Sequence, residues 1–215
     1  MLTGTRHAPQ VRAMLRTRRL PVVETWDLAQ DPIDRAVGFS NFEAARQMTL
    51  ALAAQGYRRI AFAGTPPQLE HRATQRLEGY RQAVAELGRA AQVVMLENLG
   101  VTFASGERAV TTLLARARPP DAVFFVNDVA AFGAAQACQR LGVEVPGRLA
   151  IAGFGDFELA RAANPALTTV RIPGEQIGRT AAGLIVERLA AEGGRALAQV
   201  RSLDLGFEIV RRGSA

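Results

Sequence analysis

Two short polar side chains, Asn127 and Asp128, follow directly after the apolar run Ala122–Val126. The run has the length and the aromatic and β-branched content of a buried strand, and an alanine-rich helical pattern follows the pair. In an open parallel sheet, ligands bind at the carboxyl ends of the strands. An amide that donates and accepts, beside a carboxylate that accepts, suits the hydroxyl groups of a polyol. The pair is equally suited to capping the next helix, so both roles stay open.

The residue types of common catalytic sites do not occur here in the required patterns. The two histidines, His7 and His71, lie far apart, and neither belongs to a Glu-x-x-His pair. There is no Gly-x-Ser-x-Gly elbow and no phosphate-binding loop, and the pair Gly153 and Gly155 lacks the third glycine of a dinucleotide fingerprint. The single cysteine, Cys138, has no histidine nearby in sequence. We therefore expect no enzyme, no metal site and no cofactor.

Composition places the chain among ordinary globular proteins. Its 215 residues, 48% apolar and 21% charged, predict about one or two domains. No apolar run approaches the roughly 20 residues that span a bilayer, and residues 1–7 lack the apolar core of a secretory signal. One cysteine excludes an internal disulfide framework. These features favour a cytoplasmic location without a membrane partner.

The net charge of +6 raises the question of nucleic-acid binding. Every basic side chain is arginine, and the chain contains no lysine. The one dense cluster consists of Arg12, Arg16, Arg18 and Arg19, at helical spacing and without interleaved aromatic residues. This pattern predicts a solvated helix face rather than a phosphate-binding surface.

Short apolar segments alternate with amphipathic ones along the whole chain, which predicts an α/β protein with doubly wound parallel sheets. The expected strands are Pro21–Thr25, Ala36–Phe39, Arg59–Ala63, Val93–Glu97, Ala122–Val126, Leu149–Gly153, Thr168–Ile172 and Ser202–Val210. The expected helices are Pro9–Arg18, Asn41–Gln55, Arg72–Leu87, Ser105–Ala117, Val129–Leu141 and Pro173–Ala191.

Several motifs, in a fixed order, carry a family resemblance: Ala36–Asn41, Gly56–Gly64, Arg76–Tyr80, Val126–Gly133, Gly142, Val145–Pro146, Ile151–Phe154, Asn164–Val170 and Arg212–Ser214. Together they resemble the sensor domain of the LacI/GalR family of bacterial repressors. The stretch Leu20–Met48 resembles most the gluconate-utilisation repressor branch. The resemblance implies a two-lobed, periplasmic-binding-protein-like fold that binds a sugar-like effector between the lobes without a cofactor.

The resemblance also implies a domain organisation. Residues 1–39 and 170–200 would form a partial N-terminal lobe, and residues 40–169 and 201–215 the C-terminal lobe. Family members carry a helix-turn-helix module and a further part of the N-terminal lobe, and neither is found in this sequence. We therefore expect an N-terminally truncated chain with an incomplete N-terminal lobe. Operator DNA would be bound only through an N-terminal module that is absent from this chain.

The resemblance places Arg76 and Asn127 at the effector. The guanidinium of Arg76 is a rigid fork of donors that suits a carboxylate or vicinal hydroxyl groups, and a sugar acid such as gluconate has both. Arg72 lies one helical turn before Arg76 and would add positive charge, although exposure to solvent is an equal alternative. Where many relatives carry an acidic ligand residue, this chain has Gly155, so the carboxylate is either shifted to Asp156 or lost.

Three aromatic residues, Phe39, Trp26 and Phe103, match further positions near the effector. Trp26 could stack on the C–H face of a sugar, but core packing is an equal alternative for Trp26 and for Phe39. Phe103 is a weaker candidate because loop lengths vary in that region. Phe157 and Leu159 follow the glycine-rich loop in a region that forms the dimer interface in the family, and local core packing is again an alternative.

Three function classes follow. The first is the effector-sensing and dimerisation part of a LacI-type repressor that binds a sugar acid and forms a homodimer or higher homo-oligomer. The second is a stand-alone sugar-binding module without DNA binding, which as an exported protein would need a signal that we do not find. The third is a sugar-acid enzyme, for which the sequence holds no positive signal.

Overall fold

The computed structural model describes residues 1–17, 20–66, 70–96, 101–190 and 201–215. The chain divides into two compact units. The first unit comprises Met1–Ser40 and Ile172–Phe207, and the second comprises Asn41–Arg171 and Glu208–Ala215. The bounds of these units differ from those of the expected lobes at residues 40, 170–171 and 201–207.

The second unit is built on a six-stranded sheet in the order β10-β8-β7-β6-β4-β5. All neighbouring strands are parallel except β10, which runs antiparallel to β8. The strands are β4 (Ile60–Gly64), β5 (Gln92–Met95), β6 (Ala122–Phe125), β7 (Ala150–Gly155), β8 (Thr168–Arg171) and β10 (Glu208–Val210). The helices are α2 (Asn41–Ala54), α3 (His71–Glu86), α4 (Phe103–Leu114), α5 (Asp128–Arg140) and α6 (Glu158–Ala162).

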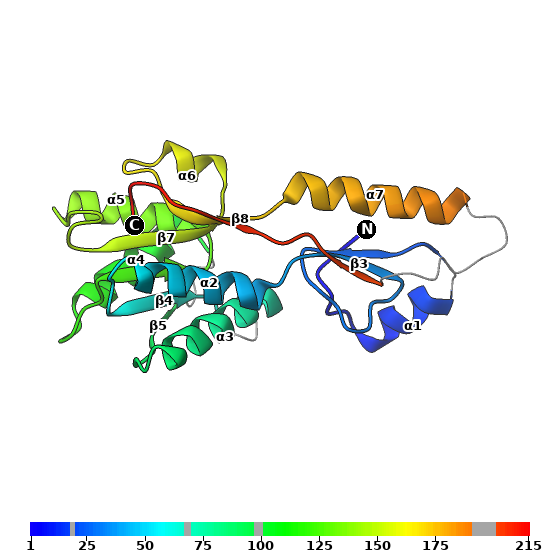
Figure 1. Ribbon diagram of the computed structural model, residues 1–215, viewed down its shortest axis with the longest axis horizontal. Helices are drawn as coiled ribbons and strands as arrows, with labels where there is room; N and C mark the ends of the chain where they lie inside the picture. The colour runs from blue at the N-terminus through cyan, green and yellow to red at the C-terminus, as the bar shows by residue number, and fades with distance from the viewer. Residues whose placement is uncertain (18–19, 67–69, 97–100, 191–200) are drawn as a thin grey trace. The chain divides into compact units, whose positions relative to one another are not determined.

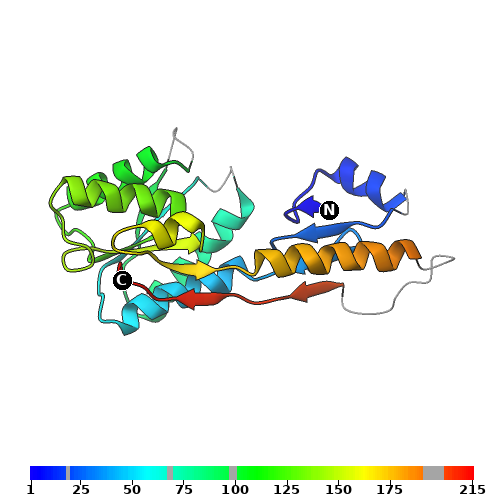
Figure 2. The ribbon, with the colours of Figure 1, turned by 90° about the horizontal axis from the view of Figure 1, so that it is seen from above.

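The helices of the second unit cover both faces of this sheet. Helices α2 and α3 pack against each other, as do α4 and α5, and Figure 2 shows α4 and α5 on the opposite side of the sheet from α2. The Phe62 ring stacks on the Tyr80 ring of α3, with ring centres 5.5 Å apart. It also packs edge-to-face against the Phe124 ring, with ring centres 5.6 Å apart. The Tyr80 hydroxyl donates to the Ile60 carbonyl and accepts from the Gln92 amide, so α3 is fixed over β4 and β5.

The first unit has a smaller, all-parallel sheet in the order β1-β2-β3-β9. Its strands are β1 (Leu2–Thr3), β2 (Val23–Thr25), β3 (Arg35–Gly38) and β9 (Ser202–Asp204). Helices α1 (Pro9–Thr17) and α7 (Gly174–Ala190) lie on opposite sides of this sheet (Figure 1). Its buried apolar side chains are Val22, Val23, Ile33, Ala36, Val37, Phe39, Ile177 and Ala181.

The predicted α/β class with parallel sheets is confirmed, and the expected elements are present with shifted ends. The single strand expected at Ser202–Val210 was wrong, because the segment forms β9 in one sheet and β10 in the other. Gly206, at a φ of 70°, separates the two strands, and its amide donates to the Asp204 carboxylate at 2.9 Å. The short helix α6 was not expected. The predicted ends at Glu97, Ala191 and Arg18, and Arg19 of the arginine cluster, lie outside the described residues.

Candidate functional site

The candidate site lies at the carboxyl edge of the six-stranded sheet. Parallel strands β4, β6 and β7 are neighbours, so the residues that follow them lie along one edge. Asn127 follows β6 and Asp156 follows β7, while α3 begins a short distance after β4. Ligands of open α/β sheets bind at this kind of edge.

Arg76 of α3 reaches this edge and is held there by three other elements. Its Nε donates to the side-chain oxygen of Asn41 at 2.9 Å, and its Nη1 donates to the Val126 carbonyl at 2.8 Å. Its guanidinium carbon lies 4.0 Å from the centre of the Phe154 ring, a cation–π geometry. The guanidinium therefore has a fixed orientation, next to the residue that precedes Asn127.

Asn127 is the N-cap of α5. Its backbone is extended, and its side-chain oxygen accepts from the Ala130 amide at 3.1 Å. The side chain is only partly buried, and its NH₂ group is a donor that the cap bond does not use. Capping and ligand binding are therefore compatible at this position, as the sequence indicated.

Arg72 lies one turn before Arg76 on α3 and is paired with an acidic side chain. Its Nε donates to Glu70 at 2.8 Å, and the same carboxylate accepts from the backbone amides of Arg72 and Ala73 as the N-cap of the helix. Burial raises the pKa of the Glu70 carboxyl, but the Arg72 hydrogen bond and the charges of Arg72 and Arg76 outweigh it and lower the pKa overall. Glu70 is therefore ionised at neutral pH.

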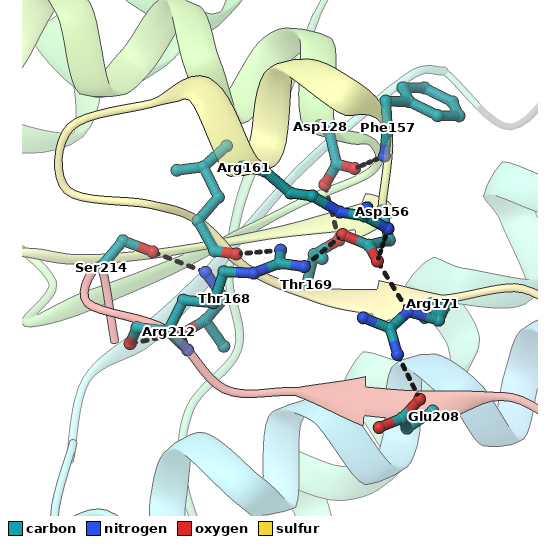
Figure 3. A network of polar contacts seen from close by, with 11 residues as sticks. Asp128, Asp156, Phe157, Arg161, Thr168, Thr169, Arg171, Glu208, Arg212 and Ser214 are labelled. Carbon is teal, nitrogen blue, oxygen red and sulfur yellow. Dashed lines mark hydrogen bonds and ion pairs between the residues drawn. The ribbon is translucent and has the colours of Figure 1, made fainter.

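Asp156 has a structural environment that the sequence did not reveal (Figure 3). It adopts a positive φ of 54°, and its side chain is 2% exposed. One oxygen accepts from Arg212 at 2.6 Å, and the other accepts from Arg171 at 2.7 Å and from Arg161 at 3.2 Å. Burial raises the pKa of this carboxyl, but the three arginine hydrogen bonds lower it below its ordinary value. Both oxygens already have strong donors, so the geometry does not favour Asp156 as an acceptor for a ligand.

Asp128, next to Asn127, is fully buried. Its carboxylate accepts from the Thr169 hydroxyl at 2.6 Å and from the Phe157 amide at 2.8 Å, and burial raises its pKa. Gly153 permits this arrangement, because a Cβ there would lie 2.1 Å from an Asp128 oxygen. Asp128 thus ties the start of α5 to β8 and to the residue before α6 (Figure 3).

The predicted aromatic residues are distributed over both units. Phe103 begins α4, is 52% exposed and packs against Phe132 with ring centres 5.3 Å apart. Phe39 and Trp26 belong to the first unit. Phe39 is buried, and Trp26 has a φ of 72° and contacts Gly174 at the start of α7. The ligand roles of these three residues stay predictions.

A surface hollow of about 450 Å³ lies in the first unit. It is lined by Ile172, Pro173, Gly174, Glu175, Gln176 and Arg179 at the start of α7. Gly174, which Trp26 contacts, is part of its lining.

Phe157 and Leu159 flank the start of α6. Phe157 is 44% exposed, and its ring lies against Gly155, while Leu159 is half-buried. Their role in subunit association stays a prediction. Within the described part of the chain, no His, Cys, Asp and Glu side chains gather in a group that could hold a metal ion. The helices described there are also too short or too polar to cross a membrane.

Three residues of the site were not predicted as such. Asn41 and Phe154 belong to the quoted motifs but were not assigned contacts with Arg76, and Glu70 was not singled out. Glu70 directly precedes α3 but lies two residues before the predicted helix Arg72–Leu87, and Ser, Thr, Asp and Asn are the usual caps, so its capping role had only a weak sequence signal.

Comparison with known proteins identifies the fold family. A model of the periplasmic binding protein-like domain matches residues 49–215. The chain belongs to this family. The Escherichia coli (strain K12) HTH-type transcriptional regulator GntR is 37% identical over all of this chain, which spans 62% of that protein's length.

Two solved structures place this periplasmic binding protein-like domain among regulators. Transcription regulator GntR from Chromobacterium violaceum superposes with a TM-score of 0.87 at 36% identity, covering 99% of this chain and 76% of that one. The transcriptional regulator CelR–cellobiose complex superposes with a TM-score of 0.81 at 29% identity, covering 100% of this chain and 64% of that chain. The resemblance to a LacI-family sensor domain is thereby confirmed.

Proposed function

We propose that this chain is the effector-sensing part of a LacI-type transcriptional repressor and that its effector is a sugar acid such as gluconate. The observation that carries the proposal is the position of Arg76. Its guanidinium lies at the carboxyl edge of the sheet, beside Asn127, in an orientation fixed by Asn41, Val126 and Phe154. A pre-oriented guanidinium loses little freedom when a carboxylate binds it.

The choice of a sugar acid follows from the chemistry of this edge. Arg76 supplies donors for a carboxylate, and the Asn127 amide supplies a donor for hydroxyl groups. Asp156 is engaged by three arginines, so its carboxylate is poorly placed to accept from the hydroxyl groups of a neutral polyol. The similar structure of CelR in complex with cellobiose supports a sugar-related effector.

The proposed mechanism is a shift between two conformations of the sensor that bind the effector with different affinity. In a complete repressor, this shift would change how paired DNA-binding modules match the spacing of operator half-sites. We further propose that the ligand binds between the two lobes and that the protein forms a homodimer or higher homo-oligomer. It would be cytoplasmic and would not catalyse a reaction.

Titration calorimetry with gluconate and with glucose tests the proposal. The two ligands have the same number of carbons and similar hydroxyl groups, but only gluconate has a carboxylate. We expect gluconate to bind and glucose to bind at least about tenfold more weakly, because one charge-assisted hydrogen-bond pair is lost. Equal affinity for the two ligands, or tighter binding of glucose, would contradict a sugar-acid effector.

A further inference from the structure

Arginines that are dispersed in the sequence come together at the amino edge of the six-stranded sheet, where its parallel strands begin. This edge is opposite the candidate site. The arginines precede four neighbouring strands, which lie in the order β5-β4-β6-β7. They are Arg58 and Arg59 before β4, Arg89 before β5, Arg116 and Arg118 before β6, and Arg148 before β7. Their spacing in the sequence did not indicate a cluster.

Backbone carbonyls hold four of these side chains in place. The acceptors are the carbonyls of Tyr57 for Arg89, Val93 for Arg116, Pro119 for Arg59 and Pro120 for Arg148, at 2.8 to 3.4 Å. A carbonyl orients a guanidinium group without neutralising its charge. Each contact also uses only one of the five N–H donors of the side chain, so the others can bind a ligand.

Carboxylates compensate little of this charge. Within the described part of the chain, Asp121 is the one carboxylate that forms an ion pair with these arginines, with Arg59 at 3.7 Å. Its two oxygens also accept from the backbone amides of Arg58 and Arg59 at 2.8 to 3.1 Å. Even with the neighbouring Glu144 counted, six positive charges meet two negative ones.

The carboxyl ends of helices α3 and α4, at Glu86 and Leu114, are a second source of negative potential near this edge. Each helix end carries about half a charge, and its effect fades within the last turn. The donors of Arg89 and Arg116 point instead to carbonyls outside these helices. Glu86 is itself paired with Arg46 of α2 at 2.9 Å. The amino edge therefore keeps a net positive charge.

We propose that this amino edge is a contact surface for the phosphate backbone of duplex DNA. Four neighbouring strands span three strand spacings, about 14 Å. One DNA strand has a phosphate every 3.4 Å or so along the duplex axis, so the row of arginines matches about four phosphates. Guanidinium groups bind phosphate oxygens through two parallel hydrogen bonds.

Duplex DNA fits this edge better than an acidic protein segment does. Its charges lie on a rigid, regular line, which suits side chains that are themselves held in place, whereas an acidic peptide would have to become ordered on binding. Phosphate contacts carry no sequence information, so recognition of an operator stays with a separate module. The inference is independent of the identity of the effector, which we place at the opposite edge.

Fluorescence anisotropy of a labelled duplex of about 20 base pairs without an operator sequence tests the inference. The wild-type chain should bind at about 0.05 M salt, and the logarithm of the affinity should fall against the logarithm of the salt concentration with a slope of about −3. Arg118→Gln/Arg148→Gln changes two exposed side chains of the edge. This variant should bind at least about tenfold more weakly, with a slope shallower by about two.

Two further variants separate local contacts from general charge and from folding. Arg16→Gln/Arg179→Gln removes the same charge from exposed arginines of the first unit that pair with Asp31 and Glu175. Its affinity should change by less than about threefold, because these charges are distant and screened. Arg58 makes its described contacts through its backbone amide, so Arg58→Gln should fold and should make the slope shallower by about one.

Losses confined to the variants of the amino edge would support the inference. It would be overturned if the wild-type chain did not bind the duplex at about 0.05 M salt, or if the variant of the first unit lost as much affinity as Arg118→Gln/Arg148→Gln. Polyglutamate that bound the chain more tightly than the duplex did at the same salt would assign the edge to an acidic protein partner, and would also overturn it.

Discussion

Arg76 receives its orientation from residues that are distant in sequence. Asn41 begins α2, Val126 directly follows β6 and Phe154 lies in β7. Each contact restricts a different part of the guanidinium: Nε, Nη1 and the flat face. A group fixed in this way binds a planar carboxylate with a smaller entropic cost than a mobile side chain would.

Replacing Arg76 with alanine should therefore remove most sugar-acid binding. We expect the affinity for gluconate to fall at least about 100-fold, because a charge-assisted, pre-oriented contact is lost. Calorimetry measures the loss, and circular dichroism checks the fold. Arg81→Ala, which removes an exposed arginine from the same helix, is the matched control and should keep wild-type affinity. Undiminished gluconate binding by Arg76→Ala would rule out the assignment of this residue.

Asp156 predicts a pH dependence of stability. Its folded pKa lies below the ordinary value of an aspartate, so its ion pairs stabilise the fold above the unfolded pKa of about 3.9. This contribution is lost as the pH falls through the lower folded pKa. Asp156→Asn should reduce the free energy of unfolding by about 2 kcal/mol at pH 7, since two of its three arginines are substantially exposed.

Urea unfolding of wild type and Asp156→Asn at pH 7 and at about pH 3 measures this effect. The difference between the two proteins should be smaller at the lower pH, where the wild-type carboxyl begins to protonate. Glu158→Gln, at an exposed carboxylate two residues away, should show no such difference at either pH. A constant difference across this range would contradict the role of the ionised carboxylate.

At the scale of elements, α4 and α5 approach each other through glycine. A Cβ on Gly106 would lie 1.9 Å from the Ala130 carbonyl oxygen, and one on Gly133 would lie 2.1 Å from the Phe103 carbonyl oxygen. No rotation of a side chain relieves a contact with backbone, so a methyl group at either position would push the helices apart. Because Asn127 caps α5, this packing also supports the candidate site.

Gly106→Ala should lower the free energy of unfolding by about 3 kcal/mol, at the upper end of the usual cost of overpacking. Gly178→Ala is the matched control, because Gly178 lies within α7 and a Cβ there would meet nothing within 4 Å. This control should raise stability by about 0.5–1 kcal/mol through helix propensity. Denaturant unfolding compares the two, and a Gly106→Ala protein as stable as wild type would contradict the close packing.

The elements show which parts of the fold were predictable from the sequence. Strands and helices of the second unit follow from long apolar or periodic segments, and their ends moved by one to a few residues. Residues Ser202–Val210 form two strands because each half pairs with a different sheet. The apolar pattern of this segment does not show with which sheet each half pairs. Helix α6 is too short for its period to be recognised, and Asp128 and Phe157 position it through a contact across the sheet edge.

The candidate site was predictable in part. Arg76, Asn127 and Arg72 were chosen from motif positions, and the structure gives Arg76 and Asn127 places along one sheet edge. The residues that contact these arginines were not predictable. Asn41 and Phe154 contact Arg76, and Glu70 contacts Arg72, through side-chain positions that the sequence pattern does not determine. Asp156 illustrates the limit best: three arginines from α6, β8 and the C-terminal segment converge on it from separate parts of the chain.

At the scale of the whole molecule, subunit association is the property most directly open to test. Phe157 is an exposed aromatic residue whose backbone is held by Asp128, so it presents a rigid apolar group. If it lies in the proposed dimer interface, light scattering of the wild-type chain should give about twice the chain mass of 23.1 kDa, and Phe157→Glu should give the monomer mass. Leu141→Glu, at another exposed apolar residue of the second unit, should remain dimeric. Equal masses for wild type and Phe157→Glu would exclude this interface.

Binding of a sugar acid at the carboxyl edge of the six-stranded sheet can be observed at the residues themselves. The most direct measurement is a nuclear magnetic resonance titration of the wild-type chain with gluconate, following the side-chain N–H signals of Arg76 and Asn127. We expect these two signals to shift together and to saturate at one affinity. Saturating shifts confined to the hollow at Ile172–Arg179, with the Arg76 and Asn127 signals unchanged, would contradict binding at this edge.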